Sequence, residues 1–229
     1  MDGVVLSHTK MGGSAICTNI AVNVDGKHRQ LRARMPPNRP IIISHFGYNA
    51  QNMNTYWQPG RTVTIDGFTE MPADLRRSTH PEDVYIVNPG AAEMKSALYM
   101  GEGLIEVVLP FTYPSFRRLY PNLRKQTTNE KGWMDPAVEN SRSVGYVWCD
   151  VCVLPSEANG KQFVRVTDAS GYTFVCSLKD EALAERIRSR AILPGRRFEN
   201  VLVRFSLSDR LEIPEVGERC YVMVSHVVI

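Results

Sequence analysis

The chain has 229 residues, a hydrophobic content of 43%, a charged content of 22% and a formal net charge of +3. This composition is ordinary for a folded globular protein, and the small net charge excludes a strongly basic nucleic-acid binder while permitting a local basic face. The five cysteines are an odd number, which argues against a complete disulfide framework and favours reduced thiols. The longest apolar runs, such as Val107–Tyr113, are too short to span a bilayer.

Segments rich in β-branched and aromatic residues recur between Gly, Pro, Asn and Asp signals, and they predict about ten strands. In chain order these strands are Ala15–Val24, Ile41–Phe46, Thr62–Gly67, Val84–Val87, Leu104–Leu109, Gly145–Leu154, Gln162–Thr167, Tyr172–Leu178, Asn200–Leu207 and Cys220–Val228. Long polar stretches at 47–60 and 120–143 are predicted to be surface loops.

One helix is predicted in the segment KDEALAERIRSRAILPG, because Asp180 can cap it and Leu183 and Ile187 fall on one stripe before Pro194 and Gly195 stop it. Shorter helical turns are expected at 26–35 and 114–119.

Several strands alternate between apolar and polar positions, which is typical of an antiparallel sheet with one solvated face. In VWCDVCVL, one face carries Val147, Cys149, Val151 and Val153. No repeat or composition shift marks a domain boundary. The pattern therefore predicts an all-β fold, a single β-sandwich or jelly roll, over residues 1–229.

The pair Cys149 and Cys152 has the spacing of half a zinc site, but a complete site needs two more ligands at suitable spacing. Positions three apart in a strand point to opposite faces, so we expect unpaired structural thiols. No nucleophile elbow, phosphate-binding glycine loop or dinucleotide fingerprint is present. The sequence therefore predicts no catalytic residues, no metal ligands, no cofactor and no enzymatic activity.

Two basic clusters could contact phosphate, although solvated surface charge is the favoured interpretation of both. The clusters are Lys27, His28, Arg29, Arg32, Arg34 and Arg39, and Arg186, Arg188, Arg190, Arg196, Arg197 and Arg204.

The segment EGLIEVVLPFTYPSF resembles a late strand of picornavirus-like jelly-roll capsid proteins, including those of the dicistrovirus and iflavirus types. The match consists of an apolar strand from Ile105 to Leu109, Pro110 at its exit, and aromatic and small residues after it. KQFVRVTDASGYTFVCSL is similar to the final strand pair of that family, and VDGKHRQLRARM to an early basic segment. The well-matched region is about 101–178.

The resemblance implies an eight-stranded antiparallel jelly-roll β-sandwich with long loops and one or two short helices. Residues 1–40 would be an N-terminal arm and 179–229 a C-terminal extension. The implied function is a structural subunit of the icosahedral capsid of a small non-enveloped positive-strand RNA virus. Its partners would be related capsid subunits, viral RNA bound weakly and without sequence preference, and a host receptor. Its location would be the virion, and the host cytoplasm during assembly.

Two sets of candidate site residues accompany this hypothesis. Aromatic and arginine side chains after Pro110 are the types enriched at interface hot spots, and they predict a subunit contact. These candidates are Phe111, Tyr113, Phe116, Arg117 and Arg118, with packing of Phe111 and Phe116 onto their own sandwich as the alternative. The RNA-facing candidates are Lys27, Arg29, Arg32 and Arg34.

Two other functions stay open. A carbohydrate-binding β-sandwich module would use exposed aromatic residues, for which Tyr56, Trp57, Trp133 and Trp148 are candidates. An enzyme with an unrecognised site is less favoured, because no convergent His–carboxylate or metal pattern is present.

Overall fold

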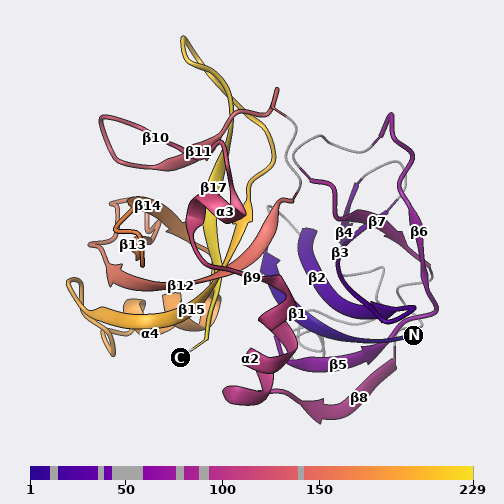
Figure 1. The fold of residues 1–229 in the computed structure, drawn as a ribbon. Helices are drawn as coiled ribbons and strands as arrows, with labels where there is room; N and C mark the ends of the chain where they lie inside the picture. The colour runs from indigo at the N-terminus through magenta and orange to yellow at the C-terminus, as the bar shows by residue number, and fades with distance from the viewer. Residues whose placement is uncertain are drawn as a thin grey trace. The chain divides into compact units, whose positions relative to one another are not determined.

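The structure is a computed structural model that describes residues 1–10, 15–35, 39–42, 59–75, 80–87, 93–138 and 142–228. It contains two compact units, Met1–Arg77 with Glu82–Pro110, and Ser78–Pro81 with Phe111–Ile229 (Figure 1). The sequence predicted one domain over residues 1–229, whereas the structure contains two units, each with its own hydrophobic core. No helix within the described ranges is long and apolar enough to cross a membrane.

The second unit contains the two longest of the described strands. Its elements are β9 (Thr112–Tyr113), α3 (Phe116–Leu119), β10 (Arg124–Lys125), β11 (Gly132–Met134), β12 (Val144–Val153), β13 (Phe163–Asp168), β14 (Thr173–Leu178), α4 (Glu181–Arg188), β15 (Arg197–Leu207), β16 (Leu211–Ile213) and β17 (Gly217–Val228).

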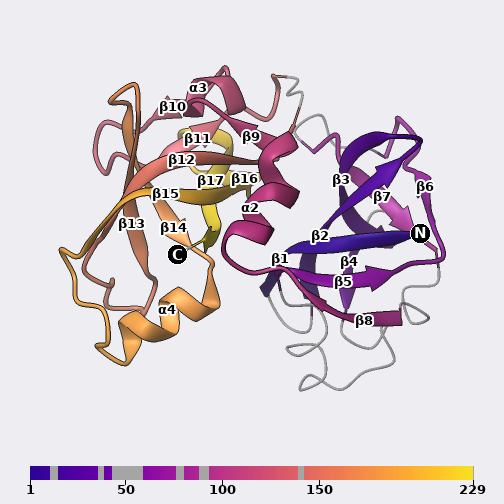
Figure 2. The ribbon, with the colours of Figure 1, turned by 60° about the horizontal axis from the view of Figure 1, so that its bottom comes forward.

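Five of these strands close into a barrel. β12 pairs with β13, β13 with β14, β14 with β17, β17 with β15, and β15 again with β12. All pairings are antiparallel except β14–β17, and α4 connects the third strand to the fourth (Figure 2). A five-stranded Greek-key barrel with this connectivity is an OB fold.

The barrel core follows the alternation seen in the sequence. Val147, Val151 and Val153 of β12 point inward with Cys149, and they pack with the inward residues of β13, β14, β15 and β17. Apolar residues of α4 join this core, and Asp180 caps the helix by accepting a hydrogen bond from the Leu183 backbone N–H at 3.0 Å.

The first unit contains eight described strands and one described α-helix. Its elements are β1 (Asp2–Lys10), β2 (Ala15–Val24), β3 (Lys27–Met35), β4 (Arg39–Ile42), β5 (Arg61–Thr64), β6 (Phe68–Glu70), β7 (Asp83–Ile86), β8 (Glu93–Leu98) and α2 (Glu102–Val108); the 3-10 turn η3 (Leu109–Phe111) follows α2 and ends in the second unit.

The first unit repeats the connectivity of the second. β1 pairs with β2, β2 pairs with β3, and β3 runs parallel to β7. These four strands correspond in order to β12, β13, β14 and β17 of the second unit. β5 pairs with β1, and β6 pairs with β7; only Ile65–Gly67 separates β5 from β6. Together they correspond to β15, which pairs with β12 and with β17 in the second unit. The chain thus contains a structural repeat that the sequence analysis did not find.

The all-β, two-sheet character is confirmed, and the predicted strands over β2, β12, β14, β15 and β17 agree with the structure, as does the predicted helix at α4. The eight-stranded jelly roll is not confirmed, because the described strand orders are those of the two barrels above. The predicted helical turn at 26–35 is wrong, since that segment forms β3. Much of the predicted strand Ile41–Phe46 and of the loop 47–60 lies outside the described residues.

The predicted strand Leu104–Leu109 is also wrong, because Glu102–Val108 is the helix α2. Leu104 and Val108, one helical turn apart, are its buried residues, while Glu106 is exposed. The apolar run therefore packs with helical spacing, and Pro110 follows just past the helix end, where proline is common.

Candidate functional site

Three hollows lie on the surface of the second unit. The sheet groove, of about 490 Å³, is lined by Thr128, Asn129, Glu130, Lys131, Leu154, Pro155, Glu157, Phe163, Arg165 and Val175. The basic groove, of about 410 Å³, is lined by Arg117, Pro121, Asn122, Leu123, Arg124, Lys125 and Tyr172. The tryptophan pocket, of about 240 Å³, is lined by Tyr113, Pro114, Trp148, Cys149, Asp150, Thr167, Asp168, Ala169 and Asn200.

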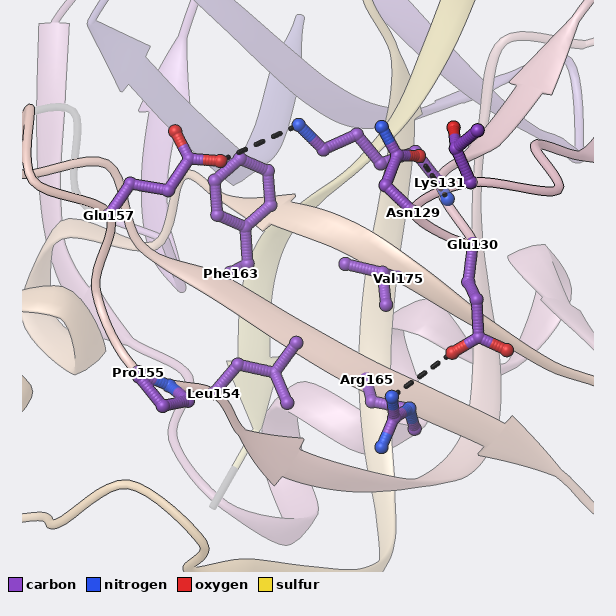
Figure 3. A pocket seen from close by; sticks show the side chains of 10 residues that line it. Asn129, Glu130, Lys131, Leu154, Pro155, Glu157, Phe163, Arg165 and Val175 are labelled. Atoms are coloured by element: carbon purple, nitrogen blue, oxygen red, sulfur yellow. Dashed lines mark hydrogen bonds and ion pairs between the residues drawn. The ribbon is translucent and has the colours of Figure 1, made fainter.

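The floor of the sheet groove is the outer face of β13 and β14 (Figure 3). Arg165 pairs with Val175 in the antiparallel register, so the two side chains share that face with Phe163. The ring of Phe163 has the Lys131 Nζ over it, 4.3 Å from the ring centroid. In an OB fold this face, between the second and third strands, is the usual ligand surface.

Two ion pairs cross the sheet groove. The Lys131 Nζ lies 3.7 Å from a Glu157 carboxylate oxygen, and the Arg165 guanidinium donates to Glu130 at 3.0 Å (Figure 3). The hydrogen bond from Arg165 is the largest cause of a lowered pKa at Glu130. The cations of this groove are therefore already matched by carboxylates, and its distinctive feature is the apolar floor.

The basic groove differs, because no carboxylate is among its described lining residues. Its two arginines lie beside aromatic rings: the Arg117 Cζ is 4.9 Å from the centroid of Tyr172, and the Arg124 Cζ is 5.3 Å from that of Trp133. Arg219 also lies over Trp133, at 4.1 Å. Cation–π contacts of this kind hold a guanidinium in place while its N–H groups stay available for an anion.

The β10–β11 hairpin positions these groups. Trp133 pairs with Arg124 on one side and with Tyr221 of β17 on the other, so the three side chains share a face. Gly132 lets the hairpin approach the barrel, because a Cβ there would overlap the ring of Phe174. The same hairpin links the two grooves, since Lys125 and Arg165 both contact Glu130.

Asp168 positions the turn between β13 and β14. Its Oδ1 accepts hydrogen bonds from the backbone N–H groups of Ser170 at 2.9 Å and Tyr172 at 3.2 Å, and its Oδ2 accepts from the Phe116 N–H at 2.8 Å. One buried carboxylate thus ties the turn that carries Tyr172 to the helix that carries Arg117.

The candidates for a subunit interface do not all lie on the surface. Phe116 is fully buried and packs edge-on against Phe174 and Phe205, with centroids 4.8 Å and 5.1 Å apart. Phe111 is also buried, so the expectation that these two rings are displayed to a neighbour is wrong. Tyr113 is half-buried with Arg142 over its ring, whereas Arg117 and Arg118 are exposed. The predicted interface itself remains a prediction.

The RNA-facing candidates are divided in the same way. Lys27 is exposed, and Arg29 forms an ion pair with Glu70 at 2.7 Å. Arg32 and Arg34 are buried, and Arg32 pairs with the buried carboxylate of Asp83. A buried guanidinium cannot meet phosphate, so the prediction is wrong for these two residues.

Cys149 and Cys152 project from opposite faces of β12, as the spacing predicts, with Cys149 in the core and Cys152 half-buried. Within the described residues no group of three or more His, Cys, Asp or Glu side chains could hold a metal ion.

The basic groove was not predicted from the sequence, although Trp133 and Trp148 were aromatic candidates. A signal was present in the stretch 117–133, where five Arg and Lys residues lie within a few positions of aromatic side chains. It was hidden because the rings of Trp133 and Tyr172 come from separate hairpins that only the barrel brings together.

No protein-family profile matches the sequence, and a search of curated proteins finds no match. Among solved structures, a murine DNA-binding protein bound with double-stranded DNA is similar over 100% of this chain and 97% of its own, with 11% identity and a TM-score of 0.35. The tetrameric p202 HIN2 is similar over 100% of this chain and 93% of its own, also with 11% identity and a TM-score of 0.35. These scores are too low to carry an argument about this chain.

Proposed function

We propose that the second unit binds single-stranded nucleic acid, with phosphates along the basic groove and bases toward the sheet groove. The observation that carries this proposal is the basic groove itself: Arg117, Arg124 and Lys125 line it beside Tyr172, and no described carboxylate lines it. Proteins that bind single strands combine a positive groove with aromatic side chains in this way.

The division between the grooves follows from their charges. Phosphate is attracted to the basic groove, because no acid is among its described lining residues and, of its three cations, only Lys125 pairs with a described carboxylate, that of Glu130 at 3.5 Å. In the sheet groove, Glu130 and Glu157 repel phosphate, but Phe163 and Val175 offer an apolar surface to a heterocycle. The contacts of Glu130 with both Lys125 and Arg165 make the two grooves neighbours, so one strand can reach both.

Single strands are favoured over duplexes by the aromatic content. The guanidiniums held over Tyr172 and Trp133 can stack only on bases whose faces are free. In a duplex these faces are covered by neighbouring base pairs, and only the phosphate contacts would remain.

The test is a fluorescence-anisotropy titration of the full chain with labelled 15-nucleotide single strands and matched duplexes, at several salt concentrations. Three phosphate contacts predict that log K falls with log salt with a slope of about −2. The triple variant Arg117→Ala, Arg124→Ala, Lys125→Ala should lose most of the affinity and most of the slope. Tighter binding of duplex than of single strand, or binding unaffected by the triple variant, would contradict the proposal.

A matched control removes the same charge elsewhere on the second unit. Lys179, Arg186 and Arg190 are exposed at and around α4, and none lines the three hollows. Their triple alanine variant should bind nearly as the parent chain does. If both triple variants weaken binding equally, the binding reflects net charge and not the basic groove.

The functions predicted from the sequence remain separate predictions. The capsid function has lost its main strand motif, because Leu104–Val108 is helical, and particle size in solution is its direct test. The carbohydrate-binding alternative keeps one candidate in a hollow, Trp148, whereas Tyr56 and Trp57 lie outside the described residues.

A further inference from the structure

We infer that the tryptophan pocket takes one unpaired nucleobase that carries an exocyclic amino group, in preference to thymine or uracil. This inference rests on the proposed function and names the base preference of the same surface. The pocket holds about 240 Å³, below the range of about 300–1,000 Å³ that suits drug-sized ligands, so a single ring system is the matching size.

The walls of the pocket suit a flat heterocycle. Trp148 and Asp150 alternate with the core residues of β12 and lie on its outer face, beside Thr167 of β13. Tyr113 of β9, which pairs in parallel with β12, also lines the pocket. An aromatic lining with a few polar groups is the general character of a small-molecule site.

Asp150 supplies the selectivity. Its Oδ1 accepts a hydrogen bond from the Asn200 backbone N–H at 2.9 Å, which fixes the carboxylate at the pocket. Its Oδ2 accepts no hydrogen bond from the described residues, and an ionised carboxylate can only accept. Cytosine and adenine present an amino donor on the Watson–Crick edge, whereas thymine and uracil present at the corresponding position a carbonyl oxygen, which the carboxylate repels.

The pocket is placed to receive a base from a strand held in the basic groove. Ala169 lines the pocket and Tyr172 lines the basic groove, and both belong to the turn that Asp168 organises. On the other side, Pro114 lines the pocket and Arg117 lines the basic groove, three residues apart in the chain. Both connections are short enough for successive nucleotides of one strand.

The experiment compares oligo-dC and oligo-dT of equal length by anisotropy competition on the full chain, with an abasic strand as the reference for phosphate binding. The parent chain should prefer oligo-dC by roughly tenfold. In Asp150→Asn the amide oxygen can still accept from the Asn200 N–H, but an N–H₂ replaces the free oxygen. The preference should therefore disappear or reverse, while the affinity for the abasic strand stays unchanged. Trp148→Leu should weaken oligo-dC and leave the abasic strand unaffected.

The outcomes separate this inference from the function on which it rests. If no strand binds, the proposed function fails. If both strands bind and their affinity ratio is the same in the parent and in Asp150→Asn, the base pocket is refuted while single-strand binding stands. Displacement of oligo-dC by a neutral oligosaccharide, abolished by Trp148→Leu, would instead assign the pocket to sugars and overturn the inference.

Discussion

Asp168→Asn is the most informative single change in the second unit. The residue is 4% exposed, and its two oxygens accept from opposite directions: Oδ1 from the β13–β14 turn, and Oδ2 from the first residue of α3, Phe116. The N–H groups of the first helical turn have no partners inside the helix, so Oδ2 satisfies one that would otherwise be buried without a partner.

The loss of unfolding free energy can be worked out from the most favourable orientation of the new amide group in Asp168→Asn. Its oxygen can keep the contacts with Ser170 and Tyr172, but its N–H₂ group then faces the Phe116 N–H, donor against donor. A lost hydrogen bond to a charged group costs about 1.5–3 kcal/mol, and a buried donor left unsatisfied costs a similar amount. We expect the free energy of unfolding to fall by about 2–4 kcal/mol.

Urea denaturation followed by tryptophan fluorescence measures this change, and Asp135→Asn is the matched control. The Asp135 side chain accepts a hydrogen bond from the Ala137 N–H at 2.9 Å, which an amide oxygen can also accept. Both variants remove one negative charge, but only Asp168→Asn creates the buried conflict. If the two variants unfold within about 0.5 kcal/mol of each other, Asp168 does not organise the turn and the reasoning fails.

Two further predictions concern buried ionisable groups. Burial is the largest cause of the raised pKa of the thiols of Cys149 and Cys176, and the charges of Asp150 and Asp168 add to it at Cys149. At pH 8 both thiols should therefore resist a charged alkylating reagent until the protein unfolds, and rapid labelling of either, seen by peptide mass spectrometry, would contradict the core assignment. Burial alone would raise the pKa of Asp180, but the hydrogen bond and charge of His226 and two backbone N–H groups outweigh it, and the pKa is lowered. A carboxyl whose pKa is lowered on folding stabilises the protein above its unfolded value of about 3.9, and this stabilisation is lost as the pH falls through the folded pKa. Asp180→Asn should therefore lower stability at pH 7 and converge with the parent chain in strong acid; an equal deficit at every pH would exclude this linkage.

The strands of the second barrel could be predicted because each is long and half-buried, so alternation is visible in the sequence. β12 is the clearest case, because the sequence alone assigns four of its inward residues to one face: Val147, Cys149, Val151 and Val153. The α4 helix could be predicted for a similar reason: its Asp180 cap and its apolar stripe are local signals.

Leu104–Leu109 could not be assigned by the same rule. A short run that is apolar except for Glu106 is compatible with a strand and with a buried helix, and its β-branched content favoured the strand. Tertiary packing selects the helix, in which Leu104 and Val108 are buried and Glu106 is exposed. The resemblance to capsid proteins depended mainly on that run, so the error in periodicity removed the main support for the functional expectation.

The repeated barrel was hidden for a different reason. The two units share the pairing of their strands but not a residue pattern, because the strand that closes the second barrel is continuous, whereas its counterpart in the first unit is broken between β5 and β6 by Ile65–Gly67. The candidate site was also hidden from the sequence, because strand pairing assembles it from separate segments. Pairing register brings Arg124 and Tyr221 to the two sides of Trp133, and a buried carboxylate joins Tyr172 to the segment of Arg117. A basic groove built in this way has no sequence motif, so arginine count and net charge cannot reveal it, and only substitutions chosen from the barrel's register can test it.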